Sequence, residues 1–103
     1  MTETTFPTPQ DISDAYNKRW KALKEEATLI VAAAMVSSYR EQELPNGTKF
    51  KGGTFALVER FFVIRGWIVQ EFAKAGWAVE TSDLFEDEIG ESAFNVHFEN
   101  RQV

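Results

Sequence analysis

The single histidine of this 103-residue chain is the first side chain that could do acid–base chemistry. His97 alternates with apolar neighbours, so a strand would place it on the outward face together with Asn95 and Glu99. We expect Glu80, from a preceding strand, across from it on the same face, where a carboxylate orients a general base. Because no serine occupies the sharp strand-to-helix turn of a hydrolase nucleophile, we interpret His97 as a solvent-facing histidine. The sequence therefore predicts no catalytic residue and no enzyme.

The segment 83–91 is the second candidate, because it holds five carboxylates in nine residues. A calcium loop needs oxygen ligands at alternate positions and a central glycine. Here Leu84, Phe85 and Ile89 interrupt that spacing and Gly90 comes too late, so we expect no metal and no other cofactor. Apolar side chains inside a charged rim are typical of a protein-binding surface, and a solvated loop is the simpler alternative. The predicted partner-binding residues are Asp83, Leu84, Phe85, Glu86, Asp87, Glu88 and Glu91.

A third candidate is an anion site ahead of the second predicted helix. Lys49, Lys51, Gly52, Gly53 and Thr54 lead into that helix, whose first backbone N–H groups, with the two lysines, suit a phosphate. A nucleotide triphosphatase loop needs a lysine where Gly53 stands and a strand before it. Both are absent, so this class of enzyme is excluded. The alternative interpretation is a flexible connector with a helix cap.

The charge of the chain is distributed unevenly. Residues 1–76 hold nine acids and ten bases, whereas residues 77–103 hold seven acids and one base, so the net charge of −5 sits in the last quarter. Nucleic-acid binding needs a basic footprint, and we expect no nucleic-acid partner. The basic cluster Lys18, Arg19, Lys21 and Lys24 is interpreted as a solvated helix face. An acidic end on a neutral body favours a basic protein partner.

The first predicted helix covers residues 9–41. Thr8 suits its cap and Pro9 its first position. Such a helix is about 50 Å long, whereas a compact domain of this size has a radius of gyration of about 13 Å. It must therefore bend near Ser37–Ser38 or pack against another chain, and we favour a homo-oligomer. The apolar stripe of this helix is Ile12, Tyr16, Trp20, Leu23, Ala27, Ile30 and Ala34, at helical spacing.

The remaining elements complete an α+β prediction for a single domain, 1–103, with a tail at 1–7. Residues 44–53 are expected to form a turn and loop, and 55–75 a second helix with Phe61, Ile64, Ile68 and Phe72 buried. Residues 77–99 alternate like a β-hairpin, with a short helix in its acidic connection. The predicted fold is therefore two long antiparallel helices packed on a C-terminal antiparallel β-hairpin, in the order α-α-β-short α-β.

The compartment is predicted from what the chain lacks. It has no cysteine, which fits a reducing compartment, and residues 1–11 contain no apolar core of a signal peptide. Its longest apolar stretch, Ala27–Val36, is ten residues, and a membrane span needs about 20. We expect a cytoplasmic protein with no membrane contact.

These features favour a non-enzymatic interaction protein whose acidic C-terminal part binds, and inhibits or modulates, a partner protein with a basic surface. In its small size, high aromatic content, lack of cysteine and acidic C-terminal part, the chain resembles phage-encoded accessory and anti-defence proteins. That resemblance is one of composition, and it implies a protein that acts by occupying a partner's surface. Two alternatives stay open: a small-molecule or nucleotide binder that uses the anion site, and a structural subunit of a larger assembly.

Overall fold

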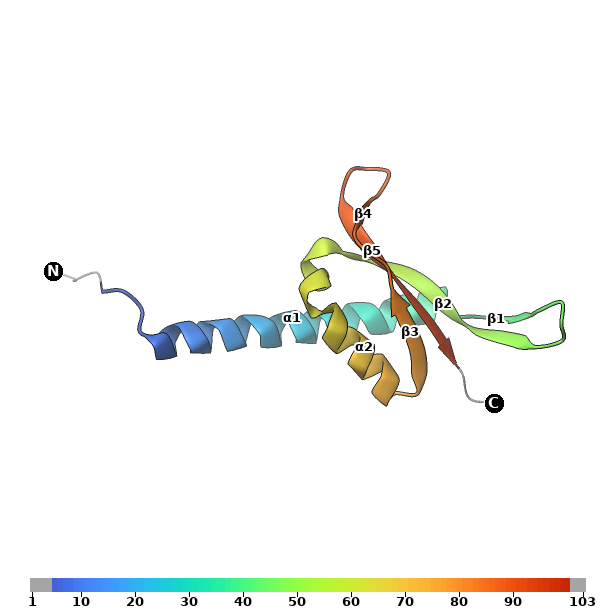
Figure 1. Ribbon diagram of the computed structural model, residues 1–103, viewed down its shortest axis with the longest axis horizontal. Helices are drawn as coiled ribbons and strands as arrows, with labels where there is room; N and C mark the ends of the chain where they lie inside the picture. The colour runs from blue at the N-terminus through green and yellow to red at the C-terminus, as the bar shows by residue number, and fades with distance from the viewer. Residues whose placement is uncertain (1–4, 101–103) are drawn as a thin grey trace.

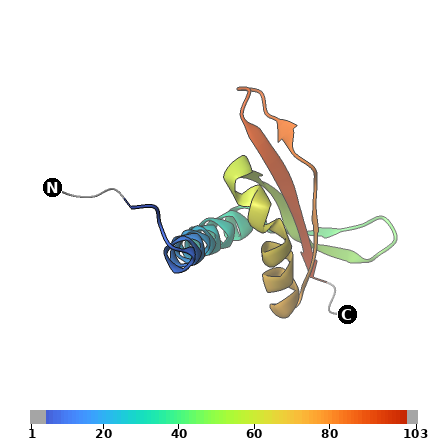
Figure 2. The same cartoon turned by 60° about the vertical axis from the view of Figure 1, so that its left-hand side comes forward.

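A computed structural model describes residues 5–100 and confirms an α+β fold, with a larger sheet and a shorter second helix than the sequence predicts (Figure 1). The sheet is antiparallel throughout, in the order β1-β2-β5-β3, and β4 pairs with a further part of β5. Both helices lie on the same side of it (Figure 2). The elements are α1 (Pro9–Ser38), β1 (Arg40–Glu43), β2 (Lys49–Val58), the 3-10 helix η1 (Glu59–Ile64), α2 (Arg65–Lys74), β3 (Trp77–Thr81), β4 (Phe85–Glu86) and β5 (Ser92–Asn100).

The sequence predicts the start of α1 correctly, but it places the end of this helix too late. The Thr8 hydroxyl accepts from the backbone of Asp11 while the Asp11 carboxylate accepts from the Thr8 backbone, which satisfies two free N–H groups. The helix ends at Ser38 instead of residue 41, because Tyr39 is extended (φ −63°, ψ 134°) and the next four residues pair with β2. The chain therefore bends after Ser38 and enters the sheet. A bend near Ser37–Ser38 is one of the two outcomes that the sequence left open.

The length of α1 makes the molecule elongated. Its 30 residues span about 45 Å, and residues 9–19 are all exposed because they project beyond the sheet (Figure 1). The molecule measures 74 × 33 × 20 Å with a radius of gyration of 18.5 Å, against about 13 Å for a compact domain of this length. An apolar run such as Leu29–Val36 is expected to be buried on most sides, but this expectation is wrong: Val31, Ala34 and Met35 are half-buried, and the others are exposed.

The predicted helix over 55–75 is wrong in its first half. Residues 49–58 form the long strand β2, η1 follows, and only Arg65–Lys74 is α-helical. Within β2, Gly53, Phe55 and Leu57 are buried while Thr54 and Ala56 are exposed, which is the period of a half-buried strand. The loop prediction for 44–53 holds only for the turn, where the Leu44 N–H donates to the Thr48 carbonyl over 2.7 Å. Gly76, with φ of 97°, follows the helical segment and ends it.

Two glycines in β2 are required by close backbone approach. A Cβ on Gly52 would lie 2.1 Å from the Phe98 carbonyl oxygen of β5, and one on Gly53 would lie 2.5 Å from the Ser38 carbonyl oxygen at the end of α1. The contact at Gly53 lets the end of α1 sit directly on the sheet, and the contact at Gly52 brings β2 close to β5. The glycine pair is therefore a packing feature and not a flexible connector.

We expect Gly53→Ala to lower the free energy of unfolding by about 1–3 kcal/mol, because two backbones must separate to admit the methyl group. Gly66→Ala is the matched control, because Gly66 lies in α2 with nothing within 4 Å of the new Cβ. That change should instead stabilise by about 0.4–1 kcal/mol by restricting the unfolded chain. Urea denaturation of both variants measures the difference, and equal stabilities would show that the approach at Gly53 is not tight.

The C-terminal strands confirm the predicted alternation, but they belong to a larger sheet than a hairpin. β3 pairs with β5, and β5 also pairs with β2 along seven residues, so β5 is a central strand. The short helix predicted between them is wrong. Residues 85–86 form β4, which pairs with Ser92 and Ala93 of β5, and a turn closes the hairpin.

The core lies between the helices and one face of the sheet. Phe61, Ile64, Ile68 and Phe72 are buried as predicted, and they meet the inward side chains of β2 and β5. Arg60 of η1 donates to the Glu26 carboxylate of α1, which ties these two elements together and lowers the pKa of Glu26. The other face of the sheet is open to solvent. The buried cluster comprises Ala27, Phe55, Leu57, Phe61, Ile64, Ile68, Phe72, Phe94, Val96 and Phe98.

Candidate functional site

The predicted partner-binding segment forms a projecting loop closed as a hairpin, here called the acidic hairpin (residues 83–91). It stands at one end of β5, away from α2 and the β1–β2 turn (Figure 1). Asp87 fixes its tip: the Oδ1 atom accepts from the N–H groups of Ile89 (3.1 Å) and Glu91 (2.8 Å), and the Asp87 N–H donates to the Glu91 carbonyl. Gly90 completes the turn with φ of 83°. Asp87 thus has a structural role that the sequence prediction missed.

The other carboxylates of the acidic hairpin are free to meet a partner. Asp83, Glu86, Glu88 and Glu91 are exposed. The ion pairs found in residues 5–100 join Glu26 to Arg60 and Glu71 to Lys74, both outside the hairpin. Four exposed acids within nine residues therefore create a negative potential at this end of the molecule, and no basic side chain of residues 5–100 forms an ion pair with them.

Three apolar side chains share this hairpin. Ile89 is 78% exposed at the tip, whereas Leu84 and Phe85 are 39% and 38% exposed. Phe85 lies in β4 opposite Ala93, so part of its ring is held by the sheet. Ile89 consequently has the largest apolar area to lose on binding, although the sequence prediction did not include it among the binding residues.

His97 lies on the open face of the sheet, as predicted, with Glu80 across from it on β3. Its Nδ1 atom is 2.8 Å from the Thr54 hydroxyl, and its ring stacks on Phe50 at 5.9 Å between centroids. The adjacent cavity, which Glu80, His97 and Glu99 help to line, has a volume of about 90 Å³, whereas ligand pockets hold about 300–1,000 Å³. The contacts orient the imidazole, but they provide no enclosed substrate site.

The structure removes the helix end on which the anion-site prediction depended. Lys49, Lys51, Gly52, Gly53 and Thr54 all lie within β2, and no helix begins at Phe55. Lys49 and Lys51 sit opposite Glu43 and Glu41 of β1, so acids face both lysines. An Asn46-Gly47 turn followed by β-branched and aromatic residues is the sequence signal that indicates this β1–β2 hairpin.

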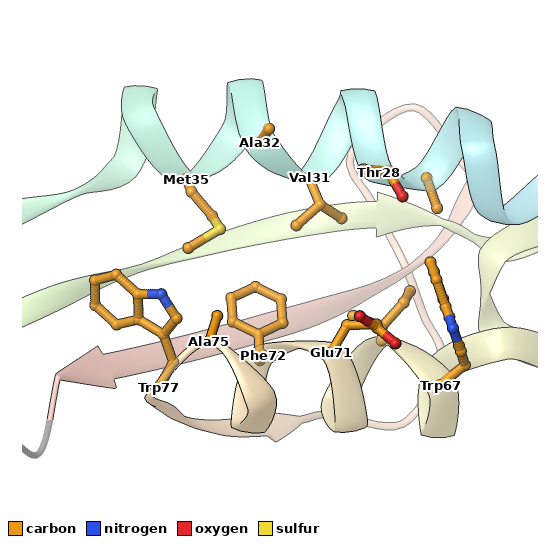
Figure 3. Close-up of a pocket in the computed structure, with 11 residues that line it drawn as sticks. Thr28, Val31, Ala32, Met35, Trp67, Glu71, Phe72, Ala75 and Trp77 are labelled. Atoms are coloured by element: carbon orange, nitrogen blue, oxygen red, sulfur yellow. The ribbon is translucent and has the colours of Figure 1, made fainter.

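An apolar groove between the helices was not anticipated from the sequence (Figure 3). It has a volume of about 230 Å³. Thr28, Ala32 and Met35 of α1 form one wall, and Trp67 and Phe72 of α2, with Trp77 beyond it, form the other. Lys24 lies over the Trp67 ring at 5.4 Å, so this member of the basic cluster packs on an aromatic ring. The groove could not be predicted from the sequence, because one of its walls lies on α2 and the sequence placed the start of that helix at residue 55 instead of Arg65.

Within residues 5–100, no three His, Asp or Glu side chains gather in a way that could hold a metal ion. In the same part of the chain no helix is long and apolar enough to cross a membrane. Comparison with protein-family models, with curated proteins and with solved structures gives no match.

Proposed function

We propose that this protein is a non-enzymatic binding module that occupies, and so inhibits or modulates, a basic surface of a partner protein through the acidic hairpin. The structure of the tip of the acidic hairpin supports this proposal. Asp87 holds Ile89 outward, and Glu86, Glu88 and Glu91 surround it without basic partners among the described residues. An apolar anchor within a charged rim is the usual anatomy of a protein interface.

The hydrogen bonds of the tip favour binding because they fix it before the partner arrives. Asp87 accepts two backbone N–H groups, so little loop entropy remains to be lost on association. A mobile acidic loop would lose that entropy at each encounter.

The alternative function, an anion binder, is less well supported. The helix N-terminus that it requires is absent at Phe55, where the chain continues as strand β2. The groove between α1 and α2 is too apolar to favour a phosphate.

Photocross-linking tests this proposal. A photoreactive phenylalanine analogue placed at Ile89, in cells that make this protein, should form a covalent adduct with a partner protein. The cross-linked peptide should be rich in lysine and arginine. The same analogue at Val63 is the matched control, because Val63 is also mostly exposed but lies on η1. Identical adducts from both positions, or none from position 89, would contradict the proposal.

A further inference from the structure

The side of α1 turned away from the core carries a row of apolar side chains that the described part of the chain leaves uncovered. Ala15, Ala22, Leu29 and Val36 follow one another at intervals of seven residues, with Ala33 between the last two. Such spacing keeps side chains on one face of a helix, as in coiled coils. Leu29 is 76% and Val36 82% exposed, and the three alanines are exposed as well. We call this row the outer face of α1.

Charged residues flank the middle of the outer face in the same order on both edges. Lys18 precedes Glu25 by seven residues along one edge, and Arg19 precedes Glu26 by seven along the other. Lys18, Arg19 and Glu25 form no ion pair within residues 5–100. The Glu26 carboxylate accepts from Arg60, and its side chain remains 44% exposed. Each edge therefore presents a base and then an acid, on either side of Ala22.

We propose that α1 pairs with α1 of a second copy of this chain, antiparallel, with the two helices crossing at Ala22. Reversing one helix about that point brings Lys18 alongside Glu25 of the second copy on one edge, and Arg19 alongside Glu26 on the other. Two-fold symmetry repeats both contacts, so four opposite-charge contacts flank the crossing. A parallel pair would instead set Lys18 beside Arg19 of the second copy and Glu25 beside its Glu26, and both contacts are repulsive.

The apolar side chains fit the same register. Leu29 lies seven residues after Ala22 and Ala15 seven before it, so the antiparallel pair sets each Leu29 against Ala15 of the second copy. A large side chain facing a small one is how knobs fill holes between helices. Ala22 at the crossing has only a methyl group and permits close approach. The charges thus select the antiparallel orientation and the register, and the sizes of the side chains fit both.

The mass in solution tests the pairing. Sedimentation velocity at tens of micromolar should give twice the chain mass of 11.7 kDa, and Leu29→Glu combined with Val36→Glu should reduce it to one chain mass. Both side chains are exposed in the single chain, so its fold should survive, which circular dichroism checks. Val63→Glu is the control, an exposed apolar-to-acidic change elsewhere that should leave the dimer intact. A monomeric wild type, or a dimer that persists in the double variant, would overturn the proposal.

Disulfide formation tests the orientation, because the chain contains no cysteine of its own. Ala22→Cys should link two copies at the crossing under mild oxidation. Ala33→Cys should not, because an antiparallel pair separates its two copies by 22 residues, or about 33 Å, far beyond the ~7 Å limit between Cα atoms. Cross-linking at both positions would indicate a parallel pair, and no cross-linking at Ala22 would indicate another face. Either result contradicts the proposal.

An exchange of charges tests the register. Lys18→Glu alone places two glutamates against each other at this contact, and Glu25→Lys alone places two lysines against each other, so each variant should dimerise more weakly than the wild type. Mixed together, the two variants should form a heterodimer in which every contact on that edge is again attractive. Native mass spectrometry distinguishes the three dimers when one variant is labelled with ¹⁵N, because the substitutions alone barely change the mass. A statistical mixture of homodimers and heterodimers would show that these charges do not face each other.

Discussion

Replacing Phe98 by alanine is expected to lower the free energy of unfolding by about 3–5 kcal/mol, the range measured for large aromatic truncations in cores. Phe98 is completely buried on the central strand β5. Its ring lies 5.9 Å from Phe55, 5.9 Å from Phe72 and 5.2 Å from Trp77, measured between centroids. The strand is held from both sides, so we expect little collapse around the cavity and a cost near the upper end of that range.

Phe61→Ala and Phe72→Ala should cost about as much, because both rings are buried in the same cluster. Against a total stability of about 5–15 kcal/mol, any of these changes removes a large fraction. Val63→Ala is the control: its side chain is exposed, so its effect should stay within about 0.5 kcal/mol. Urea midpoints of the four variants measure these effects. A Phe98→Ala midpoint equal to that of Val63→Ala would show that β5 is not the centre of the core.

The parts of the fold that local signals determine were predictable. Thr8, Pro9 and Asp11 define the start of α1 within a few residues, and the structure confirms it. The alternation around His97 placed that residue on the open sheet face with Glu80 across from it. Both features depend on residues close in sequence or on a simple period of two, which a single sequence displays.

The parts that depend on distant contacts were not predictable in the same way. The apolar run Phe55–Val58 fits a strand or a helix, and its pairing with β5 decides the matter. Gly52 and Gly53 have the composition of a loop, yet they are small because Phe98 and Ser38 approach them. β1 has no apolar pattern at all, and its pairing with β2 alone makes it a strand.

The candidate site likewise has one part that could be predicted from the sequence and one part that could not. The acidic segment and its apolar side chains are visible in the composition. The role of Asp87 is not, because an acid before Glu88 fits a helix start as well as a turn, and the hydrogen bonds to Ile89 and Glu91 identify the turn. Asp87 must therefore be left unchanged when the hairpin charges are tested.

Reversing three hairpin charges is expected to have the largest effect on function. In the variant Glu86→Lys, Glu88→Lys and Glu91→Lys, the association rate with the cross-linked partner should fall by about 10- to 1,000-fold at low salt, the range over which charge steers encounters. Ile89→Ala should instead speed dissociation, because an apolar anchor acts after the complex has formed. All four side chains are exposed, so the fold should be unaffected.

The matched control is the variant Asp14→Lys, Glu59→Lys and Glu71→Lys. These three acids are also exposed, but they lie on α1, η1 and α2 and face no lysine across a strand. Each triple variant changes the net charge of −5 by the same amount. A difference between them therefore reports the position of the charges and not their sum.

The association rate constant as a function of ionic strength, compared between these two triple variants, tests most directly whether the acidic hairpin is the binding surface. Stopped-flow mixing with the cross-linked partner supplies it. We predict that the control variant keeps a rate that falls steeply as salt is added, because salt screens steering by exposed charges. The hairpin variant should be slow at low salt and should not slow further as salt rises. Equal rates and equal salt dependence in the two variants would contradict the account.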